Sequence, residues 1–557
     1  MIRSTFCMAL VAAVAAGLSA CSESSGSNAP APAASTPPPS PPPPPPPPPT
    51  SSGPTWTPGV FESASIFEDR CEVVRTGLDL EGNPFPDLPG SLLEEKFWLR
   101  SWTNETYLFN DEVVDRDPAT FSNRIAYFDV LRTTARTASG EEKDDFHFSE
   151  TTENFLRRRN SAPTADYGVS YAALSTTPPR DFRVRYTEPN TPASALTNGS
   201  PNFVRGTRIL EVDDVDLVNG GATQAELDTL NNGLFPRTAG ESHTFVVRDP
   251  GATATRTVTL ISENIAAKPV NRSSVIDTPS GRVGYILFNT FSPFESEREI
   301  AEAVGDLAAQ GVDDLVLDLR YNGGGLLAVA SQLSYLVAGD AATSGRTFEL
   351  LRFNNDAGNF NPVTGEFNSP IPFYSEGLGF SLPAGQPLTS LNLSRVFILS
   401  TEDTCSASEA VINGLRGIDI EVILIGDTTC GKPFGFYPTD NCGVTYYTIQ
   451  FQGVNDKGFG DYTDGFVPAD SDFVFGERLP GCVATDDLNN ELGDENEALL
   501  AAALQFREDG TCPVTAPAQP AMRAQYLSTA EGGVATTSLT PFEALLRQNR
   551  DLTMPNQ

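Results

Sequence analysis

Histidine is almost missing from this sequence, since only His147 and His243 occur in 557 residues. His147 lies in the polar stretch KDDFHFSE and His243 opens the strand-like stretch HTFVVRD, and neither has neighbours of a catalytic kind. Histidine is the proton acceptor of a Ser-His-Asp triad. Such a triad could form only if folding brought in one of these two residues from a distant segment. We expect both to be structural or surface residues.

Positive charge is also scarce. The chain has 37 lysines and arginines against 72 aspartates and glutamates, which gives a net charge of −35. This balance disfavours binding to nucleic acid or to an anionic membrane surface. The sequence also lacks a histidine and cysteine cluster with metal-ligand spacing, and it lacks a glycine-rich phosphate loop attached to a helix. We therefore expect no metal, no cofactor and no nucleic-acid partner.

The N-terminus carries an apolar run at residues 6–18, which is too short to cross a bilayer as a mature helix. It ends in Leu-Ser-Ala-Cys21, which resembles a bacterial lipobox. Residues 1–20 are therefore predicted to be a signal peptide and Cys21 a lipidated N-terminus. Because Ser22 follows the cysteine, we expect a lipid-anchored protein of the bacterial cell envelope, on the outer membrane and facing the periplasm. An ordinary secretory signal with a chance cysteine is the alternative.

Residues 21–60 are predicted to be a proline-rich tether. Twelve of the thirteen residues from Pro37 to Pro49 are proline, a composition that forms an extended polyproline II segment without internal hydrogen bonds. At about 3.1 Å per residue, it would hold the body roughly 40 Å from the anchor. A proline-rich ligand for another protein is the alternative.

One stretch in the second half of the chain has the pattern of a catalytic site. An apolar strand at residues 395–399 is followed by small residues and a predicted helix, with Ser406 or Ser408 near its cap. A second strand, at residues 421–425, leads to Lys432. A strand-turn-helix that exposes a serine, with a lysine near by, suits nucleophilic catalysis. The alternative is that the serines cap a helix and that Lys432 lies in a hairpin turn.

A Ser-Lys dyad is the economical hypothesis because histidine is so rare. A lysine accepts a proton only when it is neutral, so burial would have to lower the pKa of Lys432 from about 10.4 toward roughly 7. The apolar and glycine-rich stretch from Gly431 to Phe436 is a setting for such desolvation. Cys405 and Cys430 lie within two residues of these groups, so a cysteine nucleophile is a rival hypothesis. Export favours disulfides instead.

Three motifs occur in the following order along the chain: Asp318-Leu319-Arg320-Tyr321-Asn322-Gly323-Gly324-Gly325, Cys405-Ser406-Ala407-Ser408-Glu409 and Gly431-Lys432. Together they resemble the active-site signature of the C-terminal processing (tail-specific) serine peptidases. The resemblance implies polypeptide substrates, Ser406 as nucleophile and Lys432 as base. It also implies an oxyanion hole made by the backbone N–H groups of Gly324 and Ala407.

One position departs from the family pattern. Many members have a glutamine four residues after the lysine, which orients it, and here that position is Phe436. The orienting group is left open, with Asp440 or Asn441 as candidates. A binding protein that keeps the fold but has an inactive site is the alternative function.

Six cysteines remain once Cys7 leaves with the signal and Cys21 is lipidated, and they allow fifteen full pairings. Cys430 and Cys442 flank the Lys432 hairpin, so we predict a disulfide between them. It would close a small loop and contribute roughly 3 kcal/mol in the chain-entropy model.

The segment before the catalytic stretch divides into two predicted domains. Residues 70–160 form a helical N-terminal region, in which aromatic residues recur at helical spacing between Leu92 and Val113. Residues 163–265 contain short strands and resemble a PDZ domain, a module that adds extended peptide tails to a sheet edge. In such a domain the loop Tyr167-Gly168-Val169 would hold the end of the peptide.

Residues 275–510 are predicted to be the peptidase catalytic domain. Strands and helices alternate here, which argues for right-handed crossovers on a mostly parallel sheet, and the family resemblance implies a crotonase/Clp-protease-like fold. Residues 340–393 are predicted to be an inserted hairpin or lid. Residues 515–557 are predicted to be a loose C-terminal tail with a short helix at 541–547. The chain is thus expected to be a multidomain α/β protein.

Overall fold

The computed structural model describes residues 53–160, 162–513, 525–528 and 550–551. The chain divides into two units, residues 1–52 and 53–557, and all described residues belong to the second. The predicted signal peptide, the Cys21 anchor and the proline run lie outside the described residues. The predicted helix at 541–547 lies outside them as well.

The N-terminal region is built around one long helix. Its elements are η1 (Ala64–Ile66), β1 (Arg70–Cys71), β2 (Leu88–Pro89), α1 (Leu92–Thr106), η2 (Asn110–Glu112), η3 (Pro118–Thr120), α2 (Arg124–Phe128), β3 (Phe148–Thr151) and α3 (Thr152–Arg159). The Ser91 hydroxyl caps α1 by accepting a hydrogen bond from the Glu94 N–H. Trp98 and Trp102 of α1 are buried in an aromatic core with Phe128. The aromatic stripe therefore packs the region together.

A β-rich unit follows. Its elements are β4 (Thr164–Asp166), β5 (Val169–Ser175), β6 (Asp181–Thr187), β7 (Leu196–Thr197), β8 (Ser200–Pro201), β9 (Arg208–Val212), β10 (Val215–Asp216), α4 (Gln224–Leu234), β11 (Ser242–Arg248), β12 (Arg256–Ile261), β13 (Glu263–Ile265) and, from the C-terminal segment, β29 (Gln525–Ser528). The main sheet has the order β12-β11-β9-β6-β5-β29, with β10 paired to β9, and every pairing is antiparallel. Leu230 and Leu234 of α4 share one core with Tyr171 and Phe245 of the sheet.

The body of the protein contains a six-stranded sheet with the order β14-β15-β16-β20-β21-β28. These strands are β14 (Val270–Thr278), β15 (Gly281–Phe288), β16 (Asp314–Asp318), β20 (Arg395–Ser400), β21 (Glu421–Gly426) and β28 (Gly481–Val483). β14 runs antiparallel to β15, and the other four pairings are parallel. The carboxyl ends of β16, β20 and β21 therefore lie at one edge of the sheet, where ligands bind in open α/β sheets.

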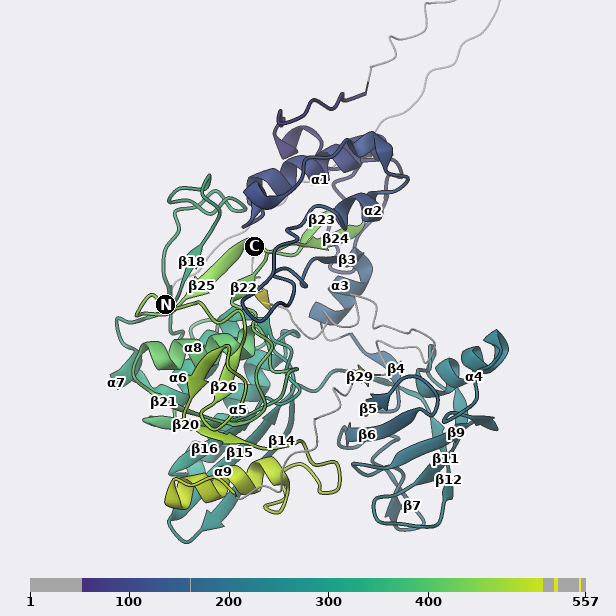
Figure 1. Ribbon diagram of the computed structural model, residues 1–557, viewed down its shortest axis with the longest axis vertical. Coiled ribbons are helices and arrows are strands. Elements are labelled where there is room, and N and C mark those ends of the chain that lie inside the picture. Colours follow the sequence, from purple (N-terminus) through teal and green to yellow (C-terminus); the bar gives the residue numbers. More distant parts are fainter. Residues whose placement is uncertain (1–52, 161, 514–524, 529–549, 552–557) are drawn as a thin grey trace, which may run out of the picture. The chain divides into compact units, whose positions relative to one another are not determined.

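Helices cover both faces of this sheet (Figure 1). They are α5 (Ser296–Gln310), α6 (Leu327–Ala338), α7 (Asp340–Thr343), α8 (Ala407–Gly417) and α9 (Ala498–Asp509). Successive strand residues point to opposite faces, so Ile398 packs in the core that contains α5, α6 and α8, whereas Leu399 packs in the core that contains α9. The two faces are hydrophobic because both are covered.

Smaller sheets surround the edge where the strands end. Their strands are β17 (Gly325–Leu326), β18 (Thr347–Arg352), β19 (Ile371–Pro372), β22 (Phe434–Gly435), β23 (Thr439–Asn441), β24 (Val444–Tyr447), β25 (Phe451–Val454), β26 (Phe466–Pro468), β27 (Glu477–Leu479) and β30 (Arg550–Asp551). β18 and β19 pair antiparallel within the predicted insertion at 340–393. β24 pairs with β3, which ties the N-terminal region to the body.

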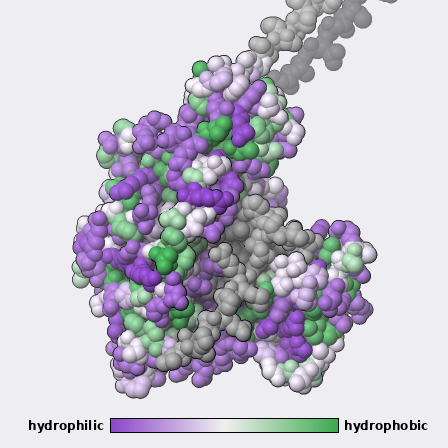
Figure 2. Space-filling model, in the orientation of Figure 1, coloured by the Kyte–Doolittle hydropathy of each residue, from purple (hydrophilic) through white to green (hydrophobic). Residues whose placement is uncertain are grey.

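One face of the described part is mainly polar. On the face shown in Figure 2, hydrophilic residues cover most of the surface and hydrophobic residues form small scattered groups. Among the described residues, none of the helices has the length and apolar character that a bilayer crossing requires.

Candidate active site

Ser406 lies in a sharp turn between the end of β20 at Ser400 and the start of α8 at Ala407. Its backbone has φ +60° and ψ −109°, a conformation that costs a residue with a side chain about 1–3 kcal/mol. The residue is fully buried, and its hydroxyl has no hydrogen-bond partner among the residues that the structure describes. A strained serine at a strand-to-helix turn, with an unpaired hydroxyl, is typical of a nucleophile.

The turn that carries Ser406 is tied to the turn that follows β16. The backbone carbonyl of Asn322 accepts hydrogen bonds from the Cys405 N–H at 3.1 Å and from the Ser408 hydroxyl at 2.9 Å. The Thr404 hydroxyl donates to the carbonyl of Leu319 at 2.9 Å. Because β16 and β20 are parallel neighbours, both turns begin at the same edge of the sheet and brace each other.

The Glu409 carboxylate connects Ser406 to Lys432. One oxygen accepts from the backbone N–H groups of Ser406 at 2.9 Å and Lys432 at 2.8 Å, and the other from the Gly431 N–H at 2.8 Å and the Thr429 hydroxyl at 2.6 Å. Burial raises the pKa of the Glu409 carboxyl, and these hydrogen bonds act against that shift. One buried side chain thus holds both turns in place.

The sequence carries a signal for this role, because Glu409 falls in the first turn of the predicted helix, where a carboxylate suits the unpaired N–H groups. A glutamate three residues after a serine at the start of a helix is placed to reach back to the backbone of the cap. Its bonds to the Lys432 turn come from a strand end more than twenty residues away, which local spacing does not reveal.

Lys432 is fully buried, and its ammonium lies between two aromatic rings. Its Nζ atom is 4.5 Å from the centre of the Phe436 ring and 4.7 Å from the centre of the Phe146 ring. Burial disfavours the charged form of an amine, whereas the faces of aromatic rings attract it. Burial and the two rings therefore act in opposite directions on the charged amine.

The candidates that the sequence left open for orienting Lys432 have other partners. The Asp440 carboxylate accepts from the Thr152 hydroxyl at 2.6 Å and from Arg75 at 2.9 Å. The Asn441 side chain accepts from the Asp69 N–H at 2.9 Å. Both side chains fasten the N-terminal region to the β23–β24 hairpin. Phe436 itself, at the position where a glutamine was expected, is in contact with the ammonium.

The predicted oxyanion donors lie on the two linked turns. Gly324 has φ +107°, and its N–H donates to the Asn322 side-chain oxygen at 2.9 Å. Gly325 has φ +136°, and a Cβ there would lie 2.3 Å from the backbone of Phe291, so only glycine fits. Ala407 is the first residue of α8, where helix N–H groups have no partner within the helix.

A buried ionic network supports the turn after β16. The Arg320 guanidinium donates to Asp318 at 2.9 Å, to Glu497 at 2.7 Å and to Asp486 at 3.0 Å. Arg205 of the β-rich unit donates to Asp486 at 2.7 Å. Burial alone would raise the pKa of Asp486, but Arg205 and Arg320 bring this pKa down to about 2. The network joins the β-rich unit to the body behind the turn that carries Gly324.

The disulfides differ from the predicted pairing, and the prediction of a Cys430–Cys442 bond is wrong. Cys405 is bonded to Cys430, with 5.2 Å between their Cα atoms, and Cys442 is bonded to Cys71. The reason is that β20 and β21 are parallel neighbours, so the segments that follow them begin side by side. Cys482 and Cys512 form a third disulfide. A cysteine nucleophile is disfavoured because both candidate sulfurs are in a disulfide.

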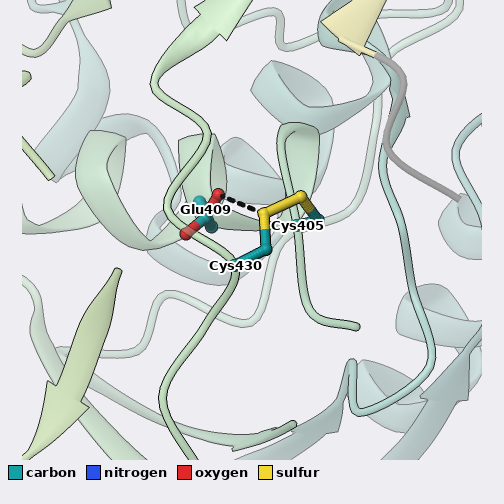
Figure 3. Close-up of side chains that lie close together, drawn as sticks. All are labelled: Cys405, Glu409 and Cys430. Atoms are coloured by element: carbon teal, nitrogen blue, oxygen red, sulfur yellow. Dashed lines mark hydrogen bonds between the residues drawn. A yellow bond between two sulfur atoms is a disulfide. The ribbon is translucent and has the colours of Figure 1, made fainter. Parts of the chain in front are cut away.

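Cys405, Glu409 and Cys430 lie close together, as Figure 3 shows. Their sulfur and oxygen atoms are within 4.8 Å of one another, and the Cys430 sulfur is 3.3 Å from the Glu409 carboxylate. Metal ligation by cysteine requires a thiolate. While the two sulfurs are bonded to each other, the disulfide is a covalent link between the Ser406 and Lys432 turns.

Both histidines have structural partners. His147 is buried, with ring nitrogens 2.9 Å from the Phe128 carbonyl and 3.0 Å from the Thr448 hydroxyl. Burial lowers its pKa to about 4. His243 lies 2.6 Å from the Asp213 carboxylate in the β-rich unit. These contacts agree with the structural role expected from the sequence.

The predicted peptide-binding loop leads into β5 of the β-rich unit. The Tyr167 hydroxyl donates to the Gly233 carbonyl at 3.1 Å, and Tyr167 is buried. Gly168 has φ +73°, and a Cβ there would clash with the side chain of Thr191. Val169 is the first residue of β5. The loop therefore turns the chain into a strand that lies next to the edge of the sheet.

Comparison with known proteins places this site in a recognised domain. The model of Peptidase family S41 matches residues 282–439, a range that contains Gly324, Ser406 and Lys432. A carboxyl-terminal-processing protease from Picosynechococcus sp. (strain ATCC 27264 / PCC 7002 / PR-6) is 30% identical over 239 residues, which are 42% of this chain and 49% of the relative. The chain thus spans about half the length of the curated relative that it matches.

A solved structure of an S41 protease from Bacteroides fragilis NCTC 9343 has a TM-score of 0.53 and 22% sequence identity, and it covers 77% of this chain and 98% of that chain. This likeness concerns the fold. The α/β class expected from the sequence is confirmed, and its mixed sheets are of the S41 type.

Proposed function

We propose that the protein is an exported serine endopeptidase that cleaves polypeptides through an acyl-enzyme, because residues 282–439 match the model of Peptidase family S41. The observation that carries the proposal is the bridge made by Glu409, which holds the backbone of Ser406 and of Lys432 through one carboxylate. A nucleophile and its base need a fixed mutual geometry.

In the proposed reaction, the Ser406 hydroxyl oxygen attacks the carbonyl carbon of the scissile bond and its proton passes to the neutral amine of Lys432. The developing oxyanion is stabilised by the Ala407 N–H at the start of α8 and by the Gly324 N–H. An oxyanion would compete with the Asn322 side chain for the Gly324 proton. Lys432 then returns a proton to the leaving amine, and water releases the acyl group.

We further propose that the β-rich unit, residues 163–265, acts as a PDZ-like domain. Its loop at Tyr167, Gly168 and Val169 would receive the end of a polypeptide, which would extend along β5 by strand addition. The proposed domains are the helical region at 70–160, this unit and the catalytic domain at 275–510. A signal at residues 1–20 and a lipid on Cys21 would place them in the bacterial cell envelope, facing the periplasm.

The test is cleavage of an unfolded protein by wild type, Ser406→Ala and Ser408→Ala, with circular dichroism to check the fold of each. Ser406→Ala should lose at least a thousandfold in kcat, because the attacking oxygen is removed. Ser408→Ala is the matched control: it removes a hydroxyl two residues away that braces Asn322, so it should keep measurable turnover. A folded but active Ser406→Ala protein would overturn the proposal. An inactive wild type that still binds the substrate would indicate a binding protein.

A further inference from the structure

The C-terminal segment of the chain contributes a strand to the β-rich unit. β29 pairs antiparallel with β5, and its register places Gln525 opposite Ala173 and Ser528 opposite Ser170. β5 pairs with β6 on its other side, so β29 is the outermost strand of the sheet, as Figure 1 shows. The edge that a peptide would join by strand addition is therefore already paired with this chain's own backbone.

A second described part of the C-terminal segment, residues 550–551, lies beside the candidate active site. β30 pairs in parallel with β17, with Arg550 opposite Gly325 and Asp551 opposite Leu326. β17 directly follows Gly324, and β30 also lies close to β22, which begins two residues after Lys432. The backbone of residues 550–551 thus lies close both to the strand that follows Gly324 and to the strand that follows Lys432.

We propose that the C-terminal segment is an intramolecular ligand that occupies the substrate path, with residues 525–528 on the β5 edge and residues 550–551 beside β17. The proposal rests on the proposed function in that it takes these two edges as the places where a polypeptide substrate binds. Both contacts are backbone pairings, which do not depend on particular side chains. Any extended polypeptide can therefore compete for the same two edges.

The direction of β29 fits that of an incoming tail. Because the pairing with β5 is antiparallel, the segment runs from Gln525 toward Ser528, which lies opposite the start of β5 next to the Tyr167-Gly168-Val169 loop. A substrate tail whose end reached that loop would run in the same direction. The chain continues beyond Ser528, so this segment binds as an internal strand.

Tethering strengthens this competition. A segment joined to its own binding site through a short connection has an effective concentration on the order of millimolar. A free polypeptide displaces the segment only when the ratio of its concentration to its Kd exceeds the same ratio for the tethered segment. The expected consequence is a weakened apparent affinity for every substrate, with no change in the chemistry after binding.

The experiment measures binding in the full-length Ser406→Ala protein, where no turnover can remove the segment. The probe is a fluorescent synthetic peptide with the sequence of residues 514–557. The test variant adds Tyr526→Pro and Leu527→Pro, because two successive prolines remove at least one N–H from the pairing with β5. Thr536→Pro, outside both strands, is the matched control. The test variant should bind the probe at least tenfold more tightly than Ser406→Ala alone, and the control should bind it as Ser406→Ala does.

A second measurement keeps the inference falsifiable if the affinities are hard to compare. Hydrogen exchange at the amides of β5 should be faster in the test variant and should slow again when the peptide is added. Equal affinity and equal exchange in all three proteins would overturn the inference. Since neither measurement needs catalysis, a wild type without peptidase activity would reject the proposed function and leave this inference standing.

Discussion

The Nζ atom of Lys432 lies 4.5 Å from the centre of the Phe436 ring. A ring face in this position stabilises the charged amine by about 0.5–2 kcal/mol. Phe436→Leu keeps an apolar side chain and removes that face, so the neutral amine becomes easier to form. The pH at which kcat/KM reaches half of its maximum should therefore fall, by about 0.4–1.5 units. Phe434→Leu, two residues earlier in the chain, is the control and should leave the midpoint unchanged.

Lys432→Arg tests the base itself. Guanidinium stays protonated at every accessible pH, so this variant should show no pH-dependent rise in activity and should lose at least a hundredfold in kcat. His243→Ala should keep most of its activity because His243 contacts Asp213 in the β-rich unit. An active arginine variant together with an inactive histidine variant would replace the dyad with a histidine-based triad.

The disulfide between Cys405 and Cys430 should matter for activity as well as stability. Changing both cysteines to alanine is expected to lower the free energy of unfolding by about 3 kcal/mol. It should also reduce kcat, because the covalent link between the Ser406 and Lys432 turns is lost. The control is the alanine pair at Cys482 and Cys512, which are separated by 30 residues compared with 25. It should cost similar stability in urea denaturation and leave kcat near the wild-type value. Equal losses of kcat in the folded fractions would contradict the prediction.

The salt links of Asp486 predict a pH dependence of stability. Its pKa is about 2 in the folded protein and about 3.9 in an unfolded chain. The carboxylate therefore stabilises the fold above about pH 4, and this contribution is lost as the pH falls from about 4 to 2. Asp486→Asn should lower the free energy of unfolding by about 3 kcal/mol at pH 7, with the same difference at pH 5 and a smaller one at pH 3. A difference that is constant down to pH 3 would show that Asp486 contributes through packing alone.

The sequence predicts the local parts of the site well. The strand, the turn and the helix around Ser406 follow from one continuous stretch, and the structure places β20 and α8 there. The position of Lys432 near this turn follows from the parallel pairing of β20 and β21, a pattern visible in alternating strands and helices. These features depend on neighbours in the chain and on one simple topology rule.

The remaining parts depend on contacts between distant segments. Phe146, which contacts Lys432, comes from the N-terminal region, and no local pattern links it to the catalytic stretch. The helix predicted up to Val113 ends at Thr106 because Tyr107 adopts an extended backbone and its hydroxyl binds Asp144. The β29 and β30 pairings likewise use residues of the predicted loose tail, where hydrophobic periodicity gives no signal.

The disulfide between Cys71 and Cys442 has a mechanical consequence. It closes a covalent ring in which the two cysteines are 371 positions apart, and Ser406 and Lys432 both lie inside that ring. Tension applied along the chain from the N-terminal side passes from Cys71 to Cys442 through the sulfur–sulfur bond. A pull between the N-terminus and the chain that follows Cys442 is therefore carried by this disulfide. It bypasses the backbone that holds Ser406 and Lys432.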